Sequence, residues 1–355
     1  MTITHIIESG GGSADFVLYL VKYLPQHHHH IIYGERAFVR INEVKQTYTN
    51  VTFYQWKNVQ REIGLLKDIK ATISLLGLIK KIECDAIHLH SSKAGFLGRF
   101  VCFFLGKKNV IYTPNGLPFI RKDISPLKVK VFLFLERAAN WLCGRVVSCS
   151  KSEAEEQIKK GIKSTYINNG TEIFDYTSKK EFDKKGKFTI ATTGRATIQK
   201  NPFLFTEIAK YFENDPNYQF LWIGGGELEY VLTSKNIKIS GWVDKSIVME
   251  QLSQADLYIS TASWEGLPFA VLEAMNLNKP LLLTNCVGNC DLVINDYNGF
   301  IFNTAGEAIE KIVFLNNKRE LLKEYAKNSH SLMEKDFSVE SMAKQYGNEY
   351  GKLIN

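Results

Sequence analysis

The feature that most constrains this chain is an alternation of short apolar segments with helix-like segments, and it occurs twice along the sequence. Strands that alternate with helices predict a parallel sheet covered by helices on both faces. The strands expected in the first half are ITHIIES, HHHIIYG, VTFYQW, AIHLH, NVIYT, RVVSCS and TYINNG. Those expected in the second half are FTIATTGR, YQFLWIGGG, IKISGWV, ADLYIST, PLLLTN and GFIFN. We therefore expect an α/β protein with two doubly wound, Rossmann-like domains that face each other across a ligand-binding cleft.

The length of 355 residues also favours two domains, because single cores rarely grow beyond about 250 to 300 residues. We expect the first domain over residues 1–176 and the second over residues 188–335. The segment 177–187, TSKKEFDKKGK, is polar and charged, which is typical of a linker. Residues 336–355 are expected to form a C-terminal helix that packs back on the first domain.

Composition excludes several classes of protein. The chain is 45% hydrophobic and 23% charged, as in globular proteins, and no apolar run is long enough to span a membrane. The first residues, MTITHIIESGGG, lack the basic start and cleavage site of a signal peptide. The six cysteines show no zinc-type spacing, so we expect reduced thiols in a cytoplasmic protein.

Charge is distributed unevenly. Residues 1–170 contain 24 Lys and Arg against 13 Asp and Glu, whereas the remainder contains 20 against 24. A basic first half predicts an anionic partner. No nucleic-acid-binding motif is present, so we expect a membrane surface or a phosphate-bearing substrate.

Glycines and histidines mark the first half. Gly10 to Gly12 follow the first expected strand and precede a helix, which suits an anion, although a tight turn would look the same. The spacing is not GxGxxG, which argues against a dinucleotide-binding oxidoreductase. His27 to His30 are interpreted as a partly exposed loop and helix end, with a metal site less favoured. His88 and His90 share a strand face; His90 ends the strand and is expected nearer the ligand, while one of the two could be a core histidine.

In the second half, GRATIQKNP places Arg195 at a strand end and Lys200 at the next helix entry. Two cations at that edge would neutralise a diphosphate, Arg by its fork and Lys as a point charge. In IGGGELE, Gly224 to Gly226 permit a close backbone approach, and Glu227 and Glu229 are expected to begin a helix in a structural role.

The segment SWEGLPFAVLEA, residues 263–274, follows an expected strand. Glu265 falls in the loop, Pro268 suits the first position of a helix and Glu273 falls within that helix. The N–H groups from Gly266 to Phe269 would bind phosphate at the helix N-terminus. The flanking carboxylates are suited to sugar hydroxyls, so a nucleotide sugar is the expected ligand.

These residues resemble the Glu-x7-Glu motif of retaining glycosyltransferases with the GT-B fold, and the chain is similar to glycosyltransferase family 4 of the bacterial O-antigen and capsule type. The resemblance covers nearly all of the chain, including HLHSSKAGFLGR, INNGTEI and the segments above. It implies transfer of a hexose or N-acetylhexosamine, with retention, from a nucleotide sugar, expected to be UDP-linked, to a lipid-carrier-linked saccharide. It implies no metal and no cofactor beyond the nucleotide sugar.

The resemblance also implies roles for particular residues. Arg195 and Lys200 would hold the diphosphate, Glu265 the donor sugar and Glu273 the ribose. The residues implied in catalysis are Glu265, Arg195, Lys200 and Asn115. The residues implied in donor binding are Gly11, Gly12, Gly225, Glu265, Gly266, Leu267, Pro268, Phe269 and Glu273. The residues implied on the acceptor side are His90, Ser91 and Lys93.

One position departs from the family. Its members commonly carry a histidine where the segment YTPNG has Asn115. Asparagine forms hydrogen bonds but does not act as an acid or base near neutral pH. Either Asn115 serves as a positioning group, or the activity is modified. The alternative functions are a nucleotide-sugar epimerase or hydrolase, which can share the fold, and a protein that binds the donor without catalysis, which Asn115 would suggest.

Residues 125–145 combine apolar side chains with four basic ones, Lys128, Lys130, Arg137 and Arg145. This pattern is compatible with a helix at a membrane surface, although a helix buried in the first domain is the preferred interpretation for most of its length. The basic first half still favours salt-sensitive contact with anionic lipid on the cytoplasmic face of the inner membrane.

Overall fold

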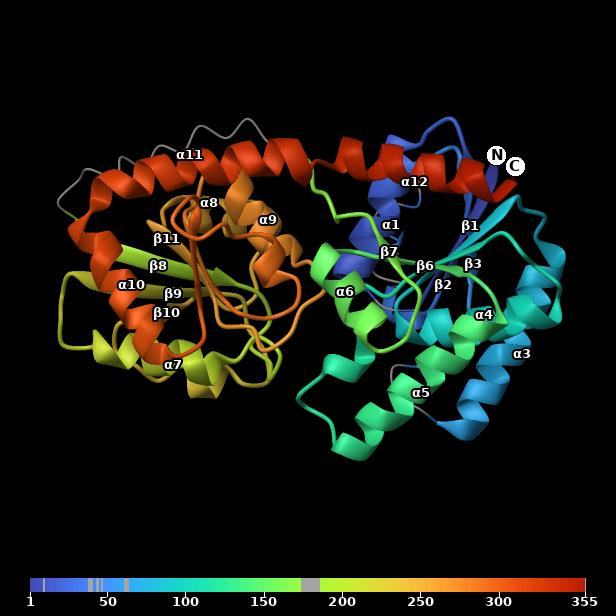
Figure 1. Cartoon of the computed structure of the whole chain (residues 1–355), viewed down its shortest axis with the longest axis horizontal. Helices are drawn as coiled ribbons and strands as arrows, with labels where there is room; N and C mark the ends of the chain where they lie inside the picture. The colour runs from blue at the N-terminus through green and yellow to red at the C-terminus, as the bar shows by residue number, and fades with distance from the viewer. Residues whose placement is uncertain are drawn as a thin grey trace. The chain divides into compact units, whose positions relative to one another are not determined.

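The computed structural model describes residues 1–8, 10–37, 41–42, 45, 47–60, 64–173 and 186–354 (Figure 1). The chain divides into two compact units. Unit 1 consists of Met1–Ile120, Ile124–Asn169 and Val339–Asn355, and unit 2 of Arg121–Asp123 and Gly170–Ser338. The last helix, α12 (Val339–Ile354), therefore belongs to unit 1. Most of the predicted linker lies outside the described residues, since only 186 and 187 of that segment are described.

Unit 1 contains a seven-stranded sheet with the order β3-β2-β1-β4-β5-β6-β7. Its strands are β1 (Thr2–Ile7), β2 (His28–Tyr33), β3 (Val51–Gln55), β4 (Ala86–His90), β5 (Val110–Thr113), β6 (Arg145–Ser148) and β7 (Thr165–Tyr166). Every pairing between neighbouring strands is parallel. Its helices are α1 (Gly12–Tyr23), α3 (Leu65–Lys81), α4 (Ser92–Phe104), α5 (Pro126–Leu142), α6 (Lys151–Lys159) and α12, with short 3-10 turns at Glu35–Ala37 and Pro118–Ile120.

The two faces of this sheet are covered differently, and β1 illustrates the contrast. Successive side chains of a strand point to opposite faces. Ile6 joins an apolar cluster with Ala71 of α3 and Leu97 of α4. His5, on the other face, lies 6.5 Å from the ring of Tyr350 on α12. One face is thus apolar beneath α3 and α4, and the other carries buried polar groups beneath α1 and α12.

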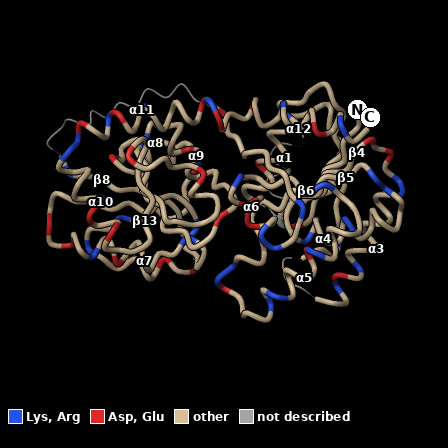
Figure 2. Tube along the Cα trace, in the orientation of Figure 1, with Lys and Arg blue, Asp and Glu red and all other residues tan. Residues whose placement is uncertain are grey.

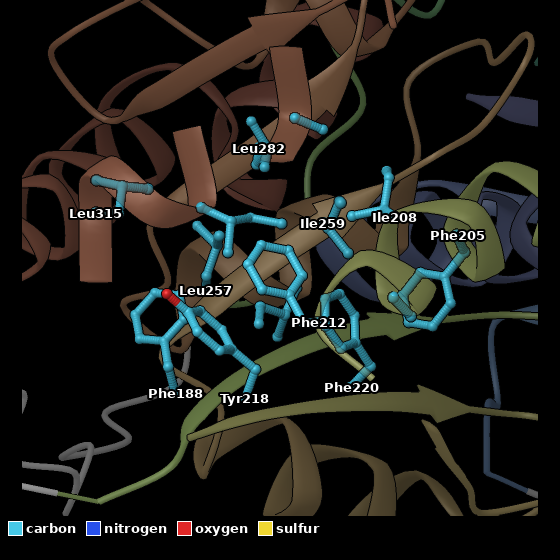
Figure 3. Close-up of a cluster of buried hydrophobic side chains, with 14 of the residues drawn as sticks. Phe188, Phe205, Ile208, Phe212, Tyr218, Phe220, Leu257, Ile259, Leu282 and Leu315 are labelled. Carbon is cyan, nitrogen blue, oxygen red and sulfur yellow. The ribbon is translucent and has the colours of Figure 1, made fainter. Parts of the chain in front are cut away.

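Unit 2 contains a six-stranded parallel sheet with the order β10-β9-β8-β11-β12-β13. Its strands are β8 (Phe188–Thr193), β9 (Tyr218–Ile223), β10 (Ile237–Ile239), β11 (Leu257–Ser260), β12 (Leu281–Thr284) and β13 (Gly299–Phe302). Its helices are α7 (Pro202–Tyr211), α8 (Lys245–Ser253), α9 (Phe269–Asn276), α10 (Ala305–Asn317) and α11 (Arg319–Asp336), with 3-10 turns at Glu229–Val231 and Asn289–Asp291. Aromatic side chains such as Phe188, Phe205 and Phe220 fill its core (Figure 3).

Both sheets reverse their strand order at one point. In unit 1 the reversal lies between β1 and β4, and in unit 2 between β8 and β11. In open parallel sheets, ligands bind outside the carboxyl ends of the strands at such a switch point. The predicted α/β fold with two doubly wound sheets is confirmed.

Two local expectations were wrong. His28 to His30 lie in β2, which confirms the expected strand HHHIIYG and contradicts their interpretation as a partly exposed loop and helix end, and His29 is fully buried. The helix expected after Gly226 is only the 3-10 turn at Glu229–Val231, because this loop packs tightly against the loop after β8.

Gly95 on α4 should be intolerant of any side chain. A Cβ atom at this position would lie 2.1 Å from Cε2 of the buried Tyr112 ring. Gly95→Ala should therefore lower the free energy of unfolding by about 1 to 3 kcal/mol, because overpacking a close-packed core forces it to shift. Urea denaturation followed by circular dichroism measures the change.

Gly77 on α3 provides the matched control, since a Cβ atom added there would meet no described atom within 4 Å. Gly77→Ala should raise the free energy of unfolding by up to about 1 kcal/mol through helix propensity alone. Equal stabilisation by both substitutions would contradict the packing of α4 on β5.

Candidate functional site

The loop after β8 in unit 2 positions two basic residues. Gly194 follows the strand with φ of 132°, and Asn201 adopts the left-handed conformation with φ of 51°. The Asn201 side chain accepts a hydrogen bond of 3.2 Å from Leu204 N and so caps α7. This geometry leads the chain from the strand edge into the helix, with Arg195 and Lys200 on the intervening loop.

Lys200 forms an ion pair with Glu265, which lies on the loop after β11. The distance from Lys200 Nζ to Glu265 Oε1 is 2.8 Å. Gln199 Nε2 donates to Glu265 Oε2 at 3.1 Å and to the Trp264 carbonyl at 3.0 Å. Both oxygens of Glu265 thus contact side chains from the loop after β8, and the residue is only 7% exposed. The two loops that flank the switch point are thereby joined.

The ion pair also determines the charge of Lys200. Burial acts to lower the pKa of its ammonium group, but the neighbouring Glu265 carboxylate helps to outweigh that effect, and the pKa lies above its usual value. Lys200 is therefore a cation throughout the neutral range. Its charge is balanced locally by Glu265.

Backbone contacts fix the loop that carries Glu265. Ser263 N donates to the Gln199 carbonyl at 2.8 Å, and Thr261 Oγ1 donates to the Lys200 carbonyl at 2.8 Å. On the other side, a Cβ atom at Gly288 would lie 2.3 Å from the Gly266 carbonyl oxygen. Only glycine fits at position 288. A side chain would clash with this carbonyl, and the φ of 83° is in addition unfavourable for other residues.

The second glutamate of the Glu-x7-Glu motif lies on α9. The helix begins at Phe269, so Pro268 is its N-cap rather than its first helical residue, one position from the expectation. Glu273 falls in the second turn, as expected, and its Oε1 lies 3.0 Å from Lys245 Nζ. Each glutamate of the motif therefore has a lysine partner.

Arg195 and the glycine loop after β9 lie on the same sheet edge. Arg195 Nε is 3.6 Å from Glu227 Oε2, and both side chains are about half exposed. A Cβ atom at Gly226 would lie 2.6 Å from the Ala196 carbonyl oxygen. One at Gly225 would lie 3.0 Å from Trp242 Nε1. The glycines are therefore required for packing within the protein, and ligand contact at Gly225 stays a prediction.

In unit 1 the corresponding edge carries the residues predicted for the acceptor side. Gly11 has φ of 66° and caps α1, which begins at Gly12. Ser91 follows β4 with φ of 69°, and its buried hydroxyl has no hydrogen-bond partner among the described residues. Both side-chain amide atoms of Asn115 are likewise buried without partners there. Lys93, by contrast, forms an ion pair with Asp68 at 2.6 Å.

A buried carboxylate holds the turn that contains Asn115. Glu153, which is fully buried on α6, accepts hydrogen bonds from Gly116 N at 2.7 Å and from Cys149 N at 2.8 Å. Asn115 itself has φ of 52°, which is uncommon outside glycine. The hydrogen bond from Gly116 N to the Glu153 carboxylate thus holds the turn in which Asn115, at the position of the family's histidine, has a strained backbone conformation.

His90 belongs to a chain of buried imidazoles. His29 Nε2 lies 3.1 Å from the Leu24 carbonyl, which can only accept, so His29 carries its proton on Nε2. His29 Nδ1 must then accept from His5 Nε2 at 3.1 Å, and His5 Nδ1 from His90 Nε2 at 3.1 Å. This order leaves an unprotonated Nδ1 on His90, which is buried with no partner in the described part of the chain.

The neighbouring His88 is satisfied on both sides. Its Nδ1 lies 2.7 Å from the Tyr350 hydroxyl, and its Nε2 lies 2.9 Å from the Thr113 hydroxyl. Among the described residues, His5, His88 and His90 form a group that could in principle hold a metal. The hydrogen bonds already account for both nitrogens of His5 and His88, so His88 is the core histidine that the sequence allowed for.

Comparison with known proteins identifies the family. Residues 10–173 match the family model described as Glycosyltransferase Family 4, and residues 174–330 match that described as Glycosyl transferases group 1. An Escherichia coli UDP-Gal:alpha-D-GlcNAc-diphosphoundecaprenol alpha-1,3-galactosyltransferase is 33% identical over 266 residues, covering 68% of this chain and 68% of that protein. This chain belongs to glycosyltransferase family 4.

Two further similarities accord with this family 4 assignment. The capsular polysaccharide biosynthesis glycosyltransferase CapM of Staphylococcus aureus is 23% identical and covers 83% of this chain and 84% of its own length. The crystal structure of Anabaena HepE in complex with UDP covers 99% of this chain and 100% of its own, with a TM-score of 0.78 and 17% identity. At that identity the likeness concerns the fold, which is GT-B. The family 4 protein is thus a glycosyltransferase with a GT-B fold.

The sequence missed the partners of its own candidates. Gln199, which contacts Glu265, could have been suspected only because it adjoins the basic residue Lys200. Lys245 and Glu153 are far along the chain from the residues they hold, and no local pattern connects them. The imidazole chain was also missed, because its histidines come from three separate strands.

Burial of the imidazoles should make stability depend on pH. It lowers the pKa of His29 to about 4 and that of His5 and His90 well below the usual 6.5. The unfolded chain therefore binds more protons than the folded one below about pH 6.5, and stability falls as the pH is lowered. His5→Phe should reduce the slope between pH 6 and 5 by up to about 1.4 kcal/mol per pH unit, measured by urea denaturation.

Gly77→Ala is the control, because it changes α3 without removing a titratable group. Its slope should equal that of the unaltered protein. An unchanged slope in His5→Phe as well would show that the imidazoles titrate normally, and the deduced tautomers would then be wrong.

Proposed function

We propose that this glycosyltransferase transfers a hexose or N-acetylhexosamine from a UDP-sugar to a saccharide on a lipid carrier, with retention of anomeric configuration, in bacterial surface polysaccharide synthesis. The names of its relatives support this proposal. One acts from UDP-Gal on a diphosphoundecaprenol-linked sugar, and another belongs to capsular polysaccharide biosynthesis. A structure of similar fold binds UDP.

The observation that carries the proposal is the Lys200–Glu265 pair at the switch point of unit 2. In our proposal, Lys200 and Arg195 bind the donor diphosphate, and Glu265 orients both Lys200 and the donor sugar. Backbone N–H groups at the start of α9 add positive potential near the phosphates. Glu273 accepts hydrogen bonds from the ribose hydroxyls, while Lys245 holds its carboxylate in place.

The proposed reaction replaces one bond at the anomeric carbon. The bond from that carbon to the diphosphate oxygen breaks, and its electron pair leaves with UDP. The acceptor oxygen forms the new bond from the same face, and its proton passes to the departing phosphate. The cations stabilise the charge that develops on the leaving group, which is why we propose that no metal is required.

The alternatives rest on the shared fold and on Asn115. An epimerase or hydrolase would form product without an acceptor, and a binding protein would form none. We propose instead that Asn115 positions a hydroxyl. Its amide can both donate and accept, and its buried atoms have no partner among the residues that the structure describes.

A transfer assay tests the function directly. The protein is incubated with a panel of UDP-, GDP- and dTDP-sugars and with an aryl-linked acceptor sugar, and products are read by mass spectrometry. We expect transfer from a UDP-sugar at a rate unchanged by EDTA, and an α-linkage by proton NMR coupling. Product without acceptor, an inverted linkage, or dependence on added metal would each contradict the corresponding part of the proposal.

Donor binding tests the assigned residues. Lys200→Ala and Glu273→Ala should each weaken UDP binding about 10- to 100-fold by isothermal titration calorimetry, since each removes about 1.4 to 2.7 kcal/mol of charged contact. Lys210→Ala and Glu207→Ala are the matched controls, because these residues are exposed on α7. Unchanged affinity in both test variants would refute the donor site.

A further inference from the structure

Helix α5 presents an apolar surface to solvent. Leu127 is 71% exposed, Phe134 68% and Trp141 86%, and Val131 is exposed as well. Along the chain, positions 127, 131, 134 and 141 are separated by four, three and seven residues, so they lie on one side of the helix. A helix on the surface of a globular protein ordinarily turns such a stripe towards the core. Here the stripe faces outward.

The opposite side of α5 is held by buried charges. Glu136 is buried there and pairs with the fully buried Arg99 of α4 at 2.6 Å. The Tyr112 hydroxyl donates to the other Glu136 oxygen at 2.9 Å, and the Arg99 guanidinium lies 4.2 Å from the centre of the Tyr112 ring. Rolling α5 to hide its apolar stripe would break this buried pair and leave an uncompensated charge in the interior.

Two neighbouring helices extend the apolar surface. Helix α4 packs against both α3 and α5. It exposes Phe100, Phe103 and Phe104, and the ring of Phe104 contacts those of the other two. Helix α3 exposes a further set of aliphatic side chains: Leu65, Leu66, Ile69 and Ile73. We refer to these exposed side chains, with the α5 stripe, as the outer face of α3, α4 and α5.

The same segment is strongly basic. Residues 64–145 contain 14 Lys and Arg against 5 Asp and Glu. Three of the five acids are already paired within the segment, to Arg99, Lys93 and Arg121. Lysines and arginines recur along α3 and α5 in Figure 2. The outer face therefore combines exposed aromatic and aliphatic side chains with unbalanced positive charge.

We propose that the outer face of α3, α4 and α5 binds an anionic lipid bilayer and inserts its apolar side chains, Trp141 among them, into the interface. Basic residues at headgroup depth beside aromatic residues are the features of an interfacial helix. No helix in the described part of the chain could cross a bilayer. A second copy of this chain is a poorer occupant, because two such faces would carry like charge.

This inference rests on the proposed function in one respect: membrane binding would bring the enzyme to its proposed lipid-linked acceptor. It corrects the preferred expectation that residues 125–145 are mostly buried, since only Glu136 and Ala139 of α5 are buried. It also goes beyond contact released by salt, because inserted aromatic side chains add attraction that salt does not screen.

Tryptophan fluorescence tests insertion at one residue. Trp56, Trp222 and Trp264 are buried, whereas Trp242 in unit 2 is 71% exposed. In the Trp242→Phe variant, vesicles of phosphatidylglycerol and phosphatidylcholine should shift the emission to the blue, and lipids brominated on the acyl chain should quench it. The matched Trp141→Phe variant should show neither change. Absence of shift and quenching in Trp242→Phe would overturn the proposal.

Co-sedimentation tests the charge contribution. Lys128→Glu/Lys130→Glu should weaken binding to the same vesicles at least about 10-fold, since each lysine near an anionic surface contributes about 1 kcal/mol. Lys210→Glu/Lys235→Glu, at exposed lysines of unit 2, should not weaken it. With unaltered protein, binding should weaken at high salt while the residual bound fraction remains quenched by brominated lipid. Complete release without quenching would mean contact by charge alone and would overturn insertion.

Two further readouts separate membrane binding from self-association and from catalysis. Sedimentation equilibrium of the unaltered protein without lipid should show no self-association through this face. Self-association that Trp141→Phe abolishes would assign the face to a second copy of the chain. Transfer to a soluble aryl-linked acceptor should be equal in the Trp141→Phe, Lys128→Glu/Lys130→Glu and Lys210→Glu/Lys235→Glu variants. Lipid binding without any transfer would refute the proposed function alone, and transfer without lipid binding would refute this inference alone.

Discussion

The parallel pairing of every strand in both sheets is the constraint on which the candidate site depends. It places the carboxyl ends of neighbouring strands on one edge, and the reversal of strand order lets two loops diverge there. In unit 2 those loops follow β8 and β11, and they carry Lys200 and Glu265. In unit 1 they follow β1 and β4, and they carry Gly11 and Ser91. Within each unit, residues far apart in sequence are thus brought to the same sheet edge by strand order alone.

Polar groups buried near these edges are held in two different ways. Glu265 pairs with Lys200 and accepts from Gln199, and Glu153 accepts from two backbone N–H groups, so both carboxylates have partners within the protein. Ser91 and Asn115 instead have left-handed backbone conformations, and their buried side-chain polar atoms have no hydrogen-bond partner among the described residues. Each unsatisfied group costs about 1 to 3 kcal/mol, and backbone strain adds to it. A protein retains such costs most readily where a ligand can satisfy the groups, which favours this edge of unit 1 as a binding surface.

The sequence predicted the fold class and the placement of Glu265 in a loop and Glu273 in a helix, because these depend on local periodicity and on proline and glycine signals. It did not predict which side chains hold them. Lys245 reaches Glu273 from another helix, and such pairing leaves no pattern along the chain. Nor could it orient α5: an apolar stripe at helical spacing is the same in sequence whether it faces a core or a membrane. The buried Arg99–Glu136 pair decides the orientation, and it joins residues on two helices.

The Lys200–Glu265 pair has a consequence for how a diphosphate could bind. Because Glu265 balances the charge of Lys200, the pair is close to neutral as a whole and attracts an anion only through its orientation. Arg195 is different: its contact with Glu227 is 3.6 Å long and largely exposed, and such pairs contribute little stability. Arg195 can therefore be redirected to a phosphate at low cost, whereas Lys200 is preorganised and stays in place. If the donor binds at this edge, Arg195 supplies the adaptable contact and Lys200 the fixed one, with Glu265 as the group that keeps Lys200 fixed.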